Sequence, residues 1–336
     1  MDLIIHVGLH KTGTTTLQES LYQNYPDLLN KHILYPQTGL FLAQHALIPG
    51  TLFSAHHAMD SVSRSTDPKH YLDLLEKEVK QHNPVLTILS SEVFTETTRN
   101  REGCLGIIDT ISRQFSSANI LLTTREEGQQ ALSSTCHIIR DNIPGRREDP
   151  VDLYFDMLKC FRTWRHFWHE SGLPIIEKRL EDSRGDLVDH YIGDIIDQYS
   201  PEAREILREY ARKQTTQNSR SNADPYYPLI YIVAFILGNS QISPAFFRKA
   251  TLKDIARECN QFVEPAARNK LVTTKNLQQY LSAFSQRKDA ATHEPSAHLS
   301  LEAKLEALKN AGLASDTITT IIAITNRLVQ NYASPD

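Results

Sequence analysis

The 336-residue chain has no run of about 18 apolar residues, the length that crosses a bilayer, so it predicts no membrane-spanning helix. An excess of positive charge is also missing. The formal net charge is −4, which argues against a nucleic-acid groove as the main binding surface. A strand pattern begins almost at Met1 and leaves no room for a signal peptide, so we expect a cytoplasmic protein.

Cysteine is scarce, with four residues in the chain. They are widely spaced, form no C-x-x-C pair and fit no metal-binding pattern; they are Cys104, Cys136, Cys160 and Cys259. No E-x-x-H or similar ligand spacing occurs either. We therefore expect thiols packed in the core and no bound metal.

Apolar and charged residues are present in ordinary amounts. They make up 40% and 23% of the chain, as in a typical globular protein. A chain of this length forms one large α/β domain, or a domain with an appendage.

Five short segments have the pattern of buried strands. They are residues 3–7, 31–36, 85–90, 119–124 and 174–178. Helical spacing of apolar residues separates the later strands, at 70–81, 105–115, 128–140 and 150–171. This alternation predicts βαβ units around a parallel sheet, with ligands bound beyond the carboxyl ends of its strands.

The C-terminal part of the chain is expected to be helical. Helical patterns cover 187–199, 203–213, 227–237, 301–308 and 318–328. We expect an α/β core over residues 1–240 and a helical extension over 241–336, with a polar linker at 285–299. The extension carries no recognisable chemistry, so packing, or formation of a homodimer, is its expected role.

The chain opens with a strand, a glycine loop and a helix, in that order. The loop spans Gly8–Thr16 and has the sequence GLHKTGTTT. Leu17 and Leu21 follow on one helical face. Backbone N–H groups at the open start of such a helix bind anions, and the helix dipole favours negative charge there. These elements predict a phosphate-binding loop.

The position of the lysine distinguishes this loop from that of nucleotide triphosphatases. Gly8 and Gly13 match the two glycines of G-x-x-x-x-G-K-[ST]. The next two positions are Thr14 and Thr15, and the lysine lies inside the loop as Lys11. This modified P-loop argues against ordinary hydrolysis of ATP or GTP.

The segment Gly8–Thr15 resembles the 5′-phosphosulfate loop of the sulfotransferases, in the form found in bacterial and glycan-modifying members. Tyr35-Pro36 followed by Thr38-Gly39 is similar to the bacterial pattern too. The resemblance covers residues 1–240 unevenly. It implies a P-loop-NTPase-like three-layer α/β core with a central parallel sheet, and transfer of a sulfuryl group from 3′-phosphoadenosine 5′-phosphosulfate (PAPS). The product would be 3′-phosphoadenosine 5′-phosphate (PAP).

A second phosphate site is expected at Arg125 and Ser133. Arg125 follows the strand at 119–124, and Ser133 lies in the next helix. A guanidinium fork and a hydroxyl both suit phosphate oxygens. The Arg-x₇-Ser spacing after a strand resembles the family's 3′-phosphate motif. Ser134 could replace Ser133, and the two acids that follow Arg125 weaken the local positive field.

The identity of the base stays open between a carboxylate and a histidine. Glu92 follows the strand at 85–90, where a carboxylate that is partly desolvated beside the cofactor could take the proton once its pKa is raised. Ser-Ser-Glu after an apolar strand is similar to the bacterial pattern. His45, or less favourably His56 and His57, could serve instead, because imidazole titrates near neutral pH.

The implied reaction is an in-line displacement. The resemblance assigns the 5′-phosphosulfate to loop residues Lys11, Thr12, Gly13, Thr14, Thr15 and Thr16, and the 3′-phosphate to Arg125 and Ser133. Lys11 stabilises charge on the bridging oxygen, and Glu92 or His45 takes the acceptor proton. No metal is required, because the loop donors and Lys11 supply the positive charge.

The acceptor is expected to be a hydroxyl or amine of a glycan, glycolipid or small molecule. The R-K-G-x-x-G pattern of soluble small-molecule sulfotransferases is absent, which favours the glycan-type branch. Two other functions stay open. A P-loop kinase would use Mg–ATP with Glu92 as a Walker-B-like acid. A non-catalytic nucleotide-binding protein would keep the fold without transferring sulfate.

Overall fold

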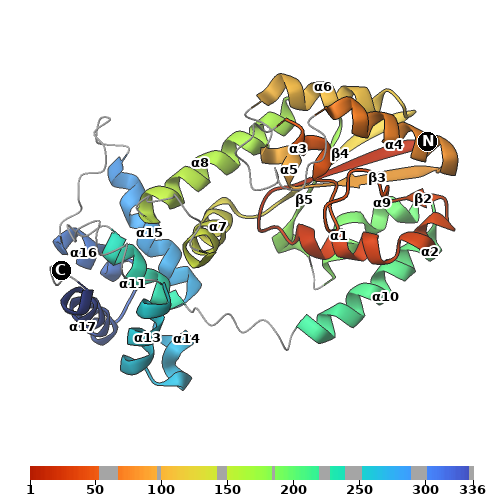
Figure 1. Ribbon diagram of the computed structural model, residues 1–336. Helices are drawn as coiled ribbons and strands as arrows, with labels where there is room; N and C mark the ends of the chain where they lie inside the picture. The colour runs from red at the N-terminus through yellow and green to blue at the C-terminus, as the bar shows by residue number, and fades with distance from the viewer. Residues whose placement is uncertain are drawn as a thin grey trace. The chain divides into compact units, whose positions relative to one another are not determined.

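The computed structural model describes residues 1–52, 67–96, 100–141, 150–183, 186–218, 228–238, 252–288 and 301–332 (Figure 1). The chain divides into two compact units. Unit 1 comprises residues 1–130 and 160–222, and unit 2 comprises residues 131–159 and 223–336. This division differs from the boundary expected at residue 240, because unit 2 begins at residue 223 and also takes in residues 131–159.

Unit 1 is built on a five-stranded parallel sheet with the strand order β2-β3-β1-β4-β5. The strands are β1 (Asp2–Gly8), β2 (Ile33–Leu34), β3 (Leu86–Ser90), β4 (Ser117–Thr124) and β5 (Ile175–Arg179). All five strands predicted from the sequence are present. Because β1 lies between β3 and β4, the segments that follow these three strands emerge side by side at one edge of the sheet.

Helices cover both faces of the sheet (Figure 1). One face carries α1 (Thr14–Gln23), α2 (Tyr25–Leu29), α9 (Asp194–Asp197) and α10 (Pro201–Asn218). The other carries α4 (Pro68–His82) and α6 (Arg101–Ser112), with the short helices α3 (Leu47–Gly50) and α5 (Val93–Glu96). The helices that cross between the units are α7 (Glu127–Asp141) and α8 (Pro150–His169). The predicted three-layer α/β core is confirmed.

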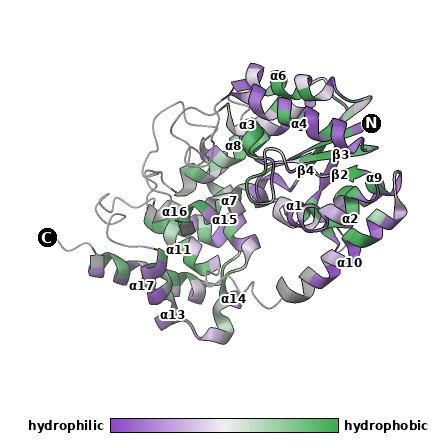
Figure 2. Ribbon diagram, turned by 45° about the vertical axis from the view of Figure 1, so that its right-hand side comes forward, coloured by the Kyte–Doolittle hydropathy of each residue, from purple (hydrophilic) through white to green (hydrophobic). Residues whose placement is uncertain are grey.

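Burial on both faces explains why β1 and β3 are largely apolar, whereas β5 at the edge of the sheet is only half-buried and ends in charged residues. Ile4, Ile88 and Leu121 point to the α1 face, where they pack with Leu17 and Leu21. Figure 2 shows the strands coloured mainly as hydrophobic, whereas α4 and α6 also carry hydrophilic residues. The core therefore fixes the register of the strands, and with it the positions of the residues that follow them.

The segment predicted as a helix at 187–199 contains a π-helical turn, η3 (Asp189–Gly193), followed by α9. Asp189 accepts hydrogen bonds from Arg204 and Arg208 of α10 at distances of 2.6–3.1 Å. These bonds lower the pKa of Asp189 to about 2, and those from Arg204 have the largest effect. They fasten the wide turn to α10. A 3₁₀ turn, η2 (Leu180–Asp182), follows β5.

Unit 2 is helical and is centred on α11 (Pro228–Gly238), whose residues 229–237 are all buried. Around it lie α13 (Leu252–Phe262), η4 (Pro265–Ala267), α14 (Arg268–Leu271), α15 (Thr274–Lys288), α16 (Leu301–Asn310) and α17 (Ser315–Tyr332). The predicted C-terminal helical extension is thus present.

The linker expected at 285–299 begins later than predicted. Residues 285–288 continue α15, since Gln, Arg and Lys are good helix formers, and residues 289–299 lie outside the described part. None of the helices described in either unit is long and apolar enough to cross a membrane.

Candidate active site

The loop between β1 and α1 is a tight turn that depends on both of its glycines. Gly13 precedes α1 with φ +81° and has no side chain to cap the helix. A Cβ on Gly13 would overlap the side chain of Leu187, and a Cβ on Gly8 would overlap that of Thr14. Lys11 also has a left-handed backbone, with φ +65°. Such conformations in non-glycine residues store strain and are concentrated at functional sites.

Gly8→Ala is expected to lower the free energy of unfolding by about 1–3 kcal/mol, because the added methyl group has no room beside the buried Thr14. The matched control is Gly106→Ala in α6, where nothing lies within 4 Å of the new Cβ. Removing a helical glycine at that site should stabilise the protein by about 0.5–1 kcal/mol. Urea unfolding measures both changes. A Gly8→Ala protein as stable as the wild type would contradict the tight-turn interpretation.

A buried hydrogen-bond network connects the loop to strands β1, β3 and β4. Thr12 Oγ1 donates to the Leu9 carbonyl (2.6 Å) and lies 3.1 Å from Thr123 Oγ1. His6 on β1 lies between Thr123 (Nε2, 3.0 Å) and Ser90 (Nδ1, 2.7 Å). The directions of the bonds follow because a carbonyl only accepts and because burial keeps His6 neutral by lowering its pKa to about 3. Thr123 donates to Thr12, His6 Nε2–H donates to Thr123, and Ser90 donates to His6 Nδ1.

His6 is thus a neutral imidazole that donates from Nε2 and accepts at Nδ1. The Thr12 side chain in the same network is completely buried. Thr12 is one of the residues expected to bind the cofactor, but its hydroxyl supports the loop instead, so its backbone N–H is the group that it can offer to a ligand.

Two residues that are distant in the sequence hold the loop by hydrogen bonds to its carbonyl groups. Tyr191 of the π-helical turn donates its hydroxyl hydrogen to the Thr12 carbonyl. Gln130 of α7 donates from Nε2 to the His10 carbonyl at 2.8 Å. Both side chains are buried, Tyr191 completely. The loop is therefore held at its centre by two separate elements, which reduces the cost of ordering it around an anion.

The carboxylate of Glu92 lies against the loop. The Thr14 hydroxyl donates to Glu92 Oε1, and His10 Nδ1 lies 2.7 Å from Glu92 Oε2. The Ser91 hydroxyl fixes the start of α5 by accepting from the Val93 N–H at 3.1 Å. The structure thus brings Glu92 together with the loop, as the sequence predicted, through two residues of the loop itself.

His10 is held between two carboxylates. Its other ring nitrogen, Nε2, lies 2.9 Å from Glu96 Oε1, and its ring meets that of Trp164 edge-on at 5.9 Å between centroids. Burial alone would lower the pKa of His10, but the hydrogen bonds and charges of Glu92 and Glu96 outweigh it and raise the pKa to about 10. His10 is therefore an imidazolium at neutral pH.

His45 has a structural position. It is completely buried. Its Nδ1 accepts a hydrogen bond from the Ser90 N–H (3.0 Å), and its Nε2 donates to the Pro36 carbonyl (2.8 Å). Burial is the main cause that lowers the pKa of His45 to about 4. With both nitrogens engaged, His45 ties the segment after β2 to the end of β3 and has no free nitrogen to take a proton from an acceptor.

The depressed pKa of His45 predicts a loss of stability in acid. The unfolded chain, with a pKa near 6.5, takes up the proton first as the pH falls. Stability from neutral His45 is thus present above pH 6.5 and declines below it, by about 2 kcal/mol at pH 5. His45→Gln should make the fall in unfolding free energy between pH 7 and 5 shallower by that amount, whereas exposed His166→Gln should not. Equal slopes for wild type and His45→Gln would contradict this.

Arg125 follows β4 as predicted. Its Nε is buried without a hydrogen-bond partner in the described part of the chain and lies 3.8 Å from Glu181 Oε1. The two acids after it are engaged elsewhere. Glu126 caps α7 by accepting from two backbone N–H groups, and Glu127 lies 2.7 Å from Arg162. Glu181, rather than Glu126 or Glu127, is therefore the carboxylate that pairs with Arg125.

The remaining predicted residues are less closely defined. Ser133 is half-buried, and Ser134 is buried with no hydrogen-bond partner for its hydroxyl among described residues. Both belong to unit 2, so their pairing with Arg125 stays a prediction. Thr15 is exposed and Thr16 is half-buried at the start of α1. His56 and His57 lie outside the described residues.

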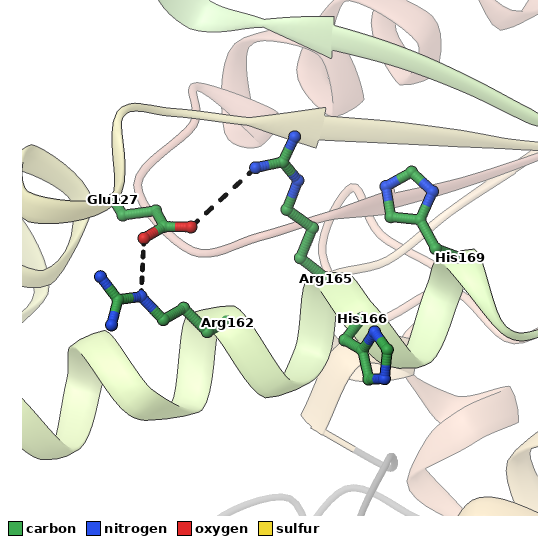
Figure 3. Close-up of a pocket in the computed structure, with 5 residues that line it drawn as sticks. All are labelled: Glu127, Arg162, Arg165, His166 and His169. Carbon is green, nitrogen blue, oxygen red and sulfur yellow. Dashed lines mark hydrogen bonds and ion pairs between the residues drawn. The ribbon is translucent and has the colours of Figure 1, made fainter.

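A shallow cleft of about 280 Å³ lies along α8 and is lined by none of the predicted residues. It is lined by Glu127, Arg162, Arg165, His166 and His169. Figure 3 shows the Glu127 carboxylate between the two arginines. Arg165 also contacts Glu177 at 2.9 Å. The positive charges in this cleft are therefore already balanced by carboxylates.

Several residues of the site were missed by the sequence analysis. Glu96 and Trp164 complete the cluster around His10, while Tyr191 and Gln130 fasten the loop. A signal existed for Glu96, which lies one helical turn after Glu92 and so faces the same way. The others come from distant parts of the chain and leave no local pattern. No protein-family model, curated protein or solved structure matches the chain.

Proposed function

We propose that the protein is a PAPS-dependent sulfotransferase that modifies a hydroxyl or amine of a glycan, glycolipid or small molecule. The observation that carries this proposal is the convergence of three elements at one sheet edge. The modified P-loop follows β1, Glu92 follows β3 on one side, and Arg125 follows β4 on the other. PAPS has two phosphate groups and reacts with an acceptor that loses a proton. The loop suits one phosphate, the Arg125 cation suits the other, and the Glu92 carboxylate beside the loop suits the proton.

The residues present fit the donor in two respects. Gly13 leaves the first N–H groups of α1 without a side-chain cap, as an anion site requires. The buried Nε of Arg125 has no hydrogen-bond partner in the described chain, and a phosphate oxygen would satisfy it. When bound, PAPS would supply the sulfuryl group, and PAP would leave with the negative charge of the oxygen released from sulfur.

The roles of the protein groups follow from their contacts. Thr14 has one hydroxyl hydrogen, which it donates to Glu92. When Thr14 turns this hydrogen to an anion in the loop, Glu92 Oε1 loses its donor and can accept a proton. We assign the base to Glu92 rather than His45, whose nitrogens are both engaged. Lys11, on the strained turn, stabilises negative charge that develops at the loop.

A kinase is the second candidate, and one contact favours it. A threonine at the start of α1 that bonds a carboxylate after the neighbouring strand is an arrangement suited to Mg²⁺ and a nucleotide phosphate. The displaced lysine argues the other way, because the position after Gly13 is Thr14. The two candidates differ in the nucleotide that binds.

Arg125→Ala is expected to weaken PAP binding by about 2 kcal/mol, the scale of a hydrogen bond to a charged group. Titration calorimetry at fixed salt measures the change. Arg113→Ala is the matched control, because that arginine is 77% exposed on α6 and pairs only with Asp109 among described residues. Affinity that is the same for Arg125→Ala and the wild type would remove Arg125 from the proposed 3′-phosphate site.

A further inference from the structure

The cluster of Glu92, His10 and Glu96 has a feature that the proposed reaction does not explain. Glu92 and Glu96 lie one helical turn apart at the start and end of α5, and the His10 ring lies between their carboxylates. The distances are 2.7 and 2.9 Å. An ionised carboxylate only accepts, so a ring that bonds two of them must donate from both nitrogens.

We propose that His10 and Glu96 are positioning residues for the base. His10 bridges the carboxylates of Glu92 and Glu96, and this bridge fixes the orientation of the Glu92 carboxylate against the phosphate loop, while Glu96 holds His10 in place. The inference rests on the proposed function in one respect only, that Glu92 is the base.

The contacts give each oxygen of Glu92 one donor from the loop. Thr14 donates to Oε1, and His10 donates to Oε2. If Thr14 turns away to an anion, His10 remains the donor that keeps the carboxylate in place. Among the described residues, His10 is then the side chain whose hydrogen bond sets the rotamer of Glu92. Misplacing a reacting group by about 1 Å lowers a rate by up to about 100-fold.

Glu96 gives the bridge its second anchor. Without it, His10 could rotate about its side-chain bonds and leave Glu92. The other groups around the ring also restrict it. Trp164 packs edge-on against it, and Gln130 holds the His10 carbonyl. Among the described residues, the charged groups facing His10 are Glu92 and Glu96, with Lys11 beside it in the loop. The positive ring also separates two carboxylates that would otherwise repel each other.

Nitrogen NMR of the free protein tests the bridge without any donor or acceptor. We expect both ring nitrogens of His10 to stay protonated at pH 8 in the wild type. Glu96→Gln should lower the pH at which His10 loses a proton by at least about one unit, and Glu96→Asp should restore part of the shift. A singly protonated His10 ring at pH 7.5 in the wild type would overturn the proposal.

Kinetics test whether the bridge acts through Glu92. PAP released from PAPS is measured against pH, with water or an added sugar hydroxyl as acceptor. His10→Asn should lower kcat about 100-fold and move the acidic limb of the pH–rate profile to higher pH. PAP affinity should change less than about threefold. In a Glu92→Gln background the same substitution should have almost no further effect. His166→Asn is the control. Equal losses in both backgrounds would show a merely structural role and overturn the proposal.

If His10→Asn fails to fold, Glu96→Gln repeats the kinetic comparison without altering the loop. The failure of the two proposals can be told apart. A wild-type protein that releases no PAP but shows the doubly protonated His10 contradicts the sulfotransferase function, whereas the bridge between Glu92 and Glu96 stands.

Discussion

Lys11→Ala is expected to lower sulfuryl transfer by at least about 100- to 1,000-fold while the protein stays folded. The reason is electrostatic. A positive group held in the loop stabilises charge on the departing phosphate in the transition state more than in the ground state, and removing one such donor has an effect of this size. PAP release from PAPS measures the rate, and PAP calorimetry shows that the site is still formed.

The backbone at Lys11 offers a control that separates strain from chemistry. Its φ of +65° is unfavourable for lysine and alanine but suits glycine. Lys11→Gly should therefore be more stable than Lys11→Ala by about 1 kcal/mol, yet equally inactive. If Lys11→Gly kept full activity, the lysine would have only a conformational role and the assignment would be wrong.

Glu92→Gln is expected to lower transfer by about 100- to 10,000-fold, the range for loss of a general base. The amide keeps the size of the side chain, so Thr14 and His10 still have a neighbour. PAP affinity should stay the same or rise, because a negative charge beside the phosphate loop is removed. The rate falls while binding does not, which distinguishes a base from a structural residue.

His45→Gln provides the comparison for the base. It removes the other candidate at a site where both ring nitrogens already have partners. We expect its rate to stay within about threefold of the wild type once its lower stability is taken into account. A large loss in His45→Gln with a small one in Glu92→Gln would reverse the assignment.

The sheet and the loop could be predicted from the sequence because their signals are local. Residues 3–7 are apolar on both faces apart from His6, since β1 lies at the centre of a sheet covered on both sides. Residues at the ends of parallel strands share one edge, so the meeting of Glu92 and the loop followed from strand positions alone. His6 carried a further signal: a histidine inside an apolar strand needs partners.

The rest of the site depends on contacts between distant segments. Tyr191 lies 179 residues after Thr12 in the sequence, yet its hydroxyl donates to the Thr12 carbonyl. It is positioned by a π-helical turn that has no recognisable sequence pattern here. His45 shows a second effect of tertiary structure. The sequence made it a candidate base because imidazole titrates near neutral pH, and the structure buries it completely. Burial of a polar residue depends on tertiary packing, which local composition does not report.

Thermal melting of the wild-type protein with PAP or with ATP–Mg²⁺ tests the proposed function most directly, because a ligand stabilises only the state that binds it. At about 100 times its dissociation constant, a ligand adds about 2.7 kcal/mol, which raises the melting temperature of a unit of this size by roughly 5 °C or more. We predict this rise with PAP and none with ATP–Mg²⁺. A rise with ATP–Mg²⁺ alone would contradict the sulfotransferase proposal and favour the kinase.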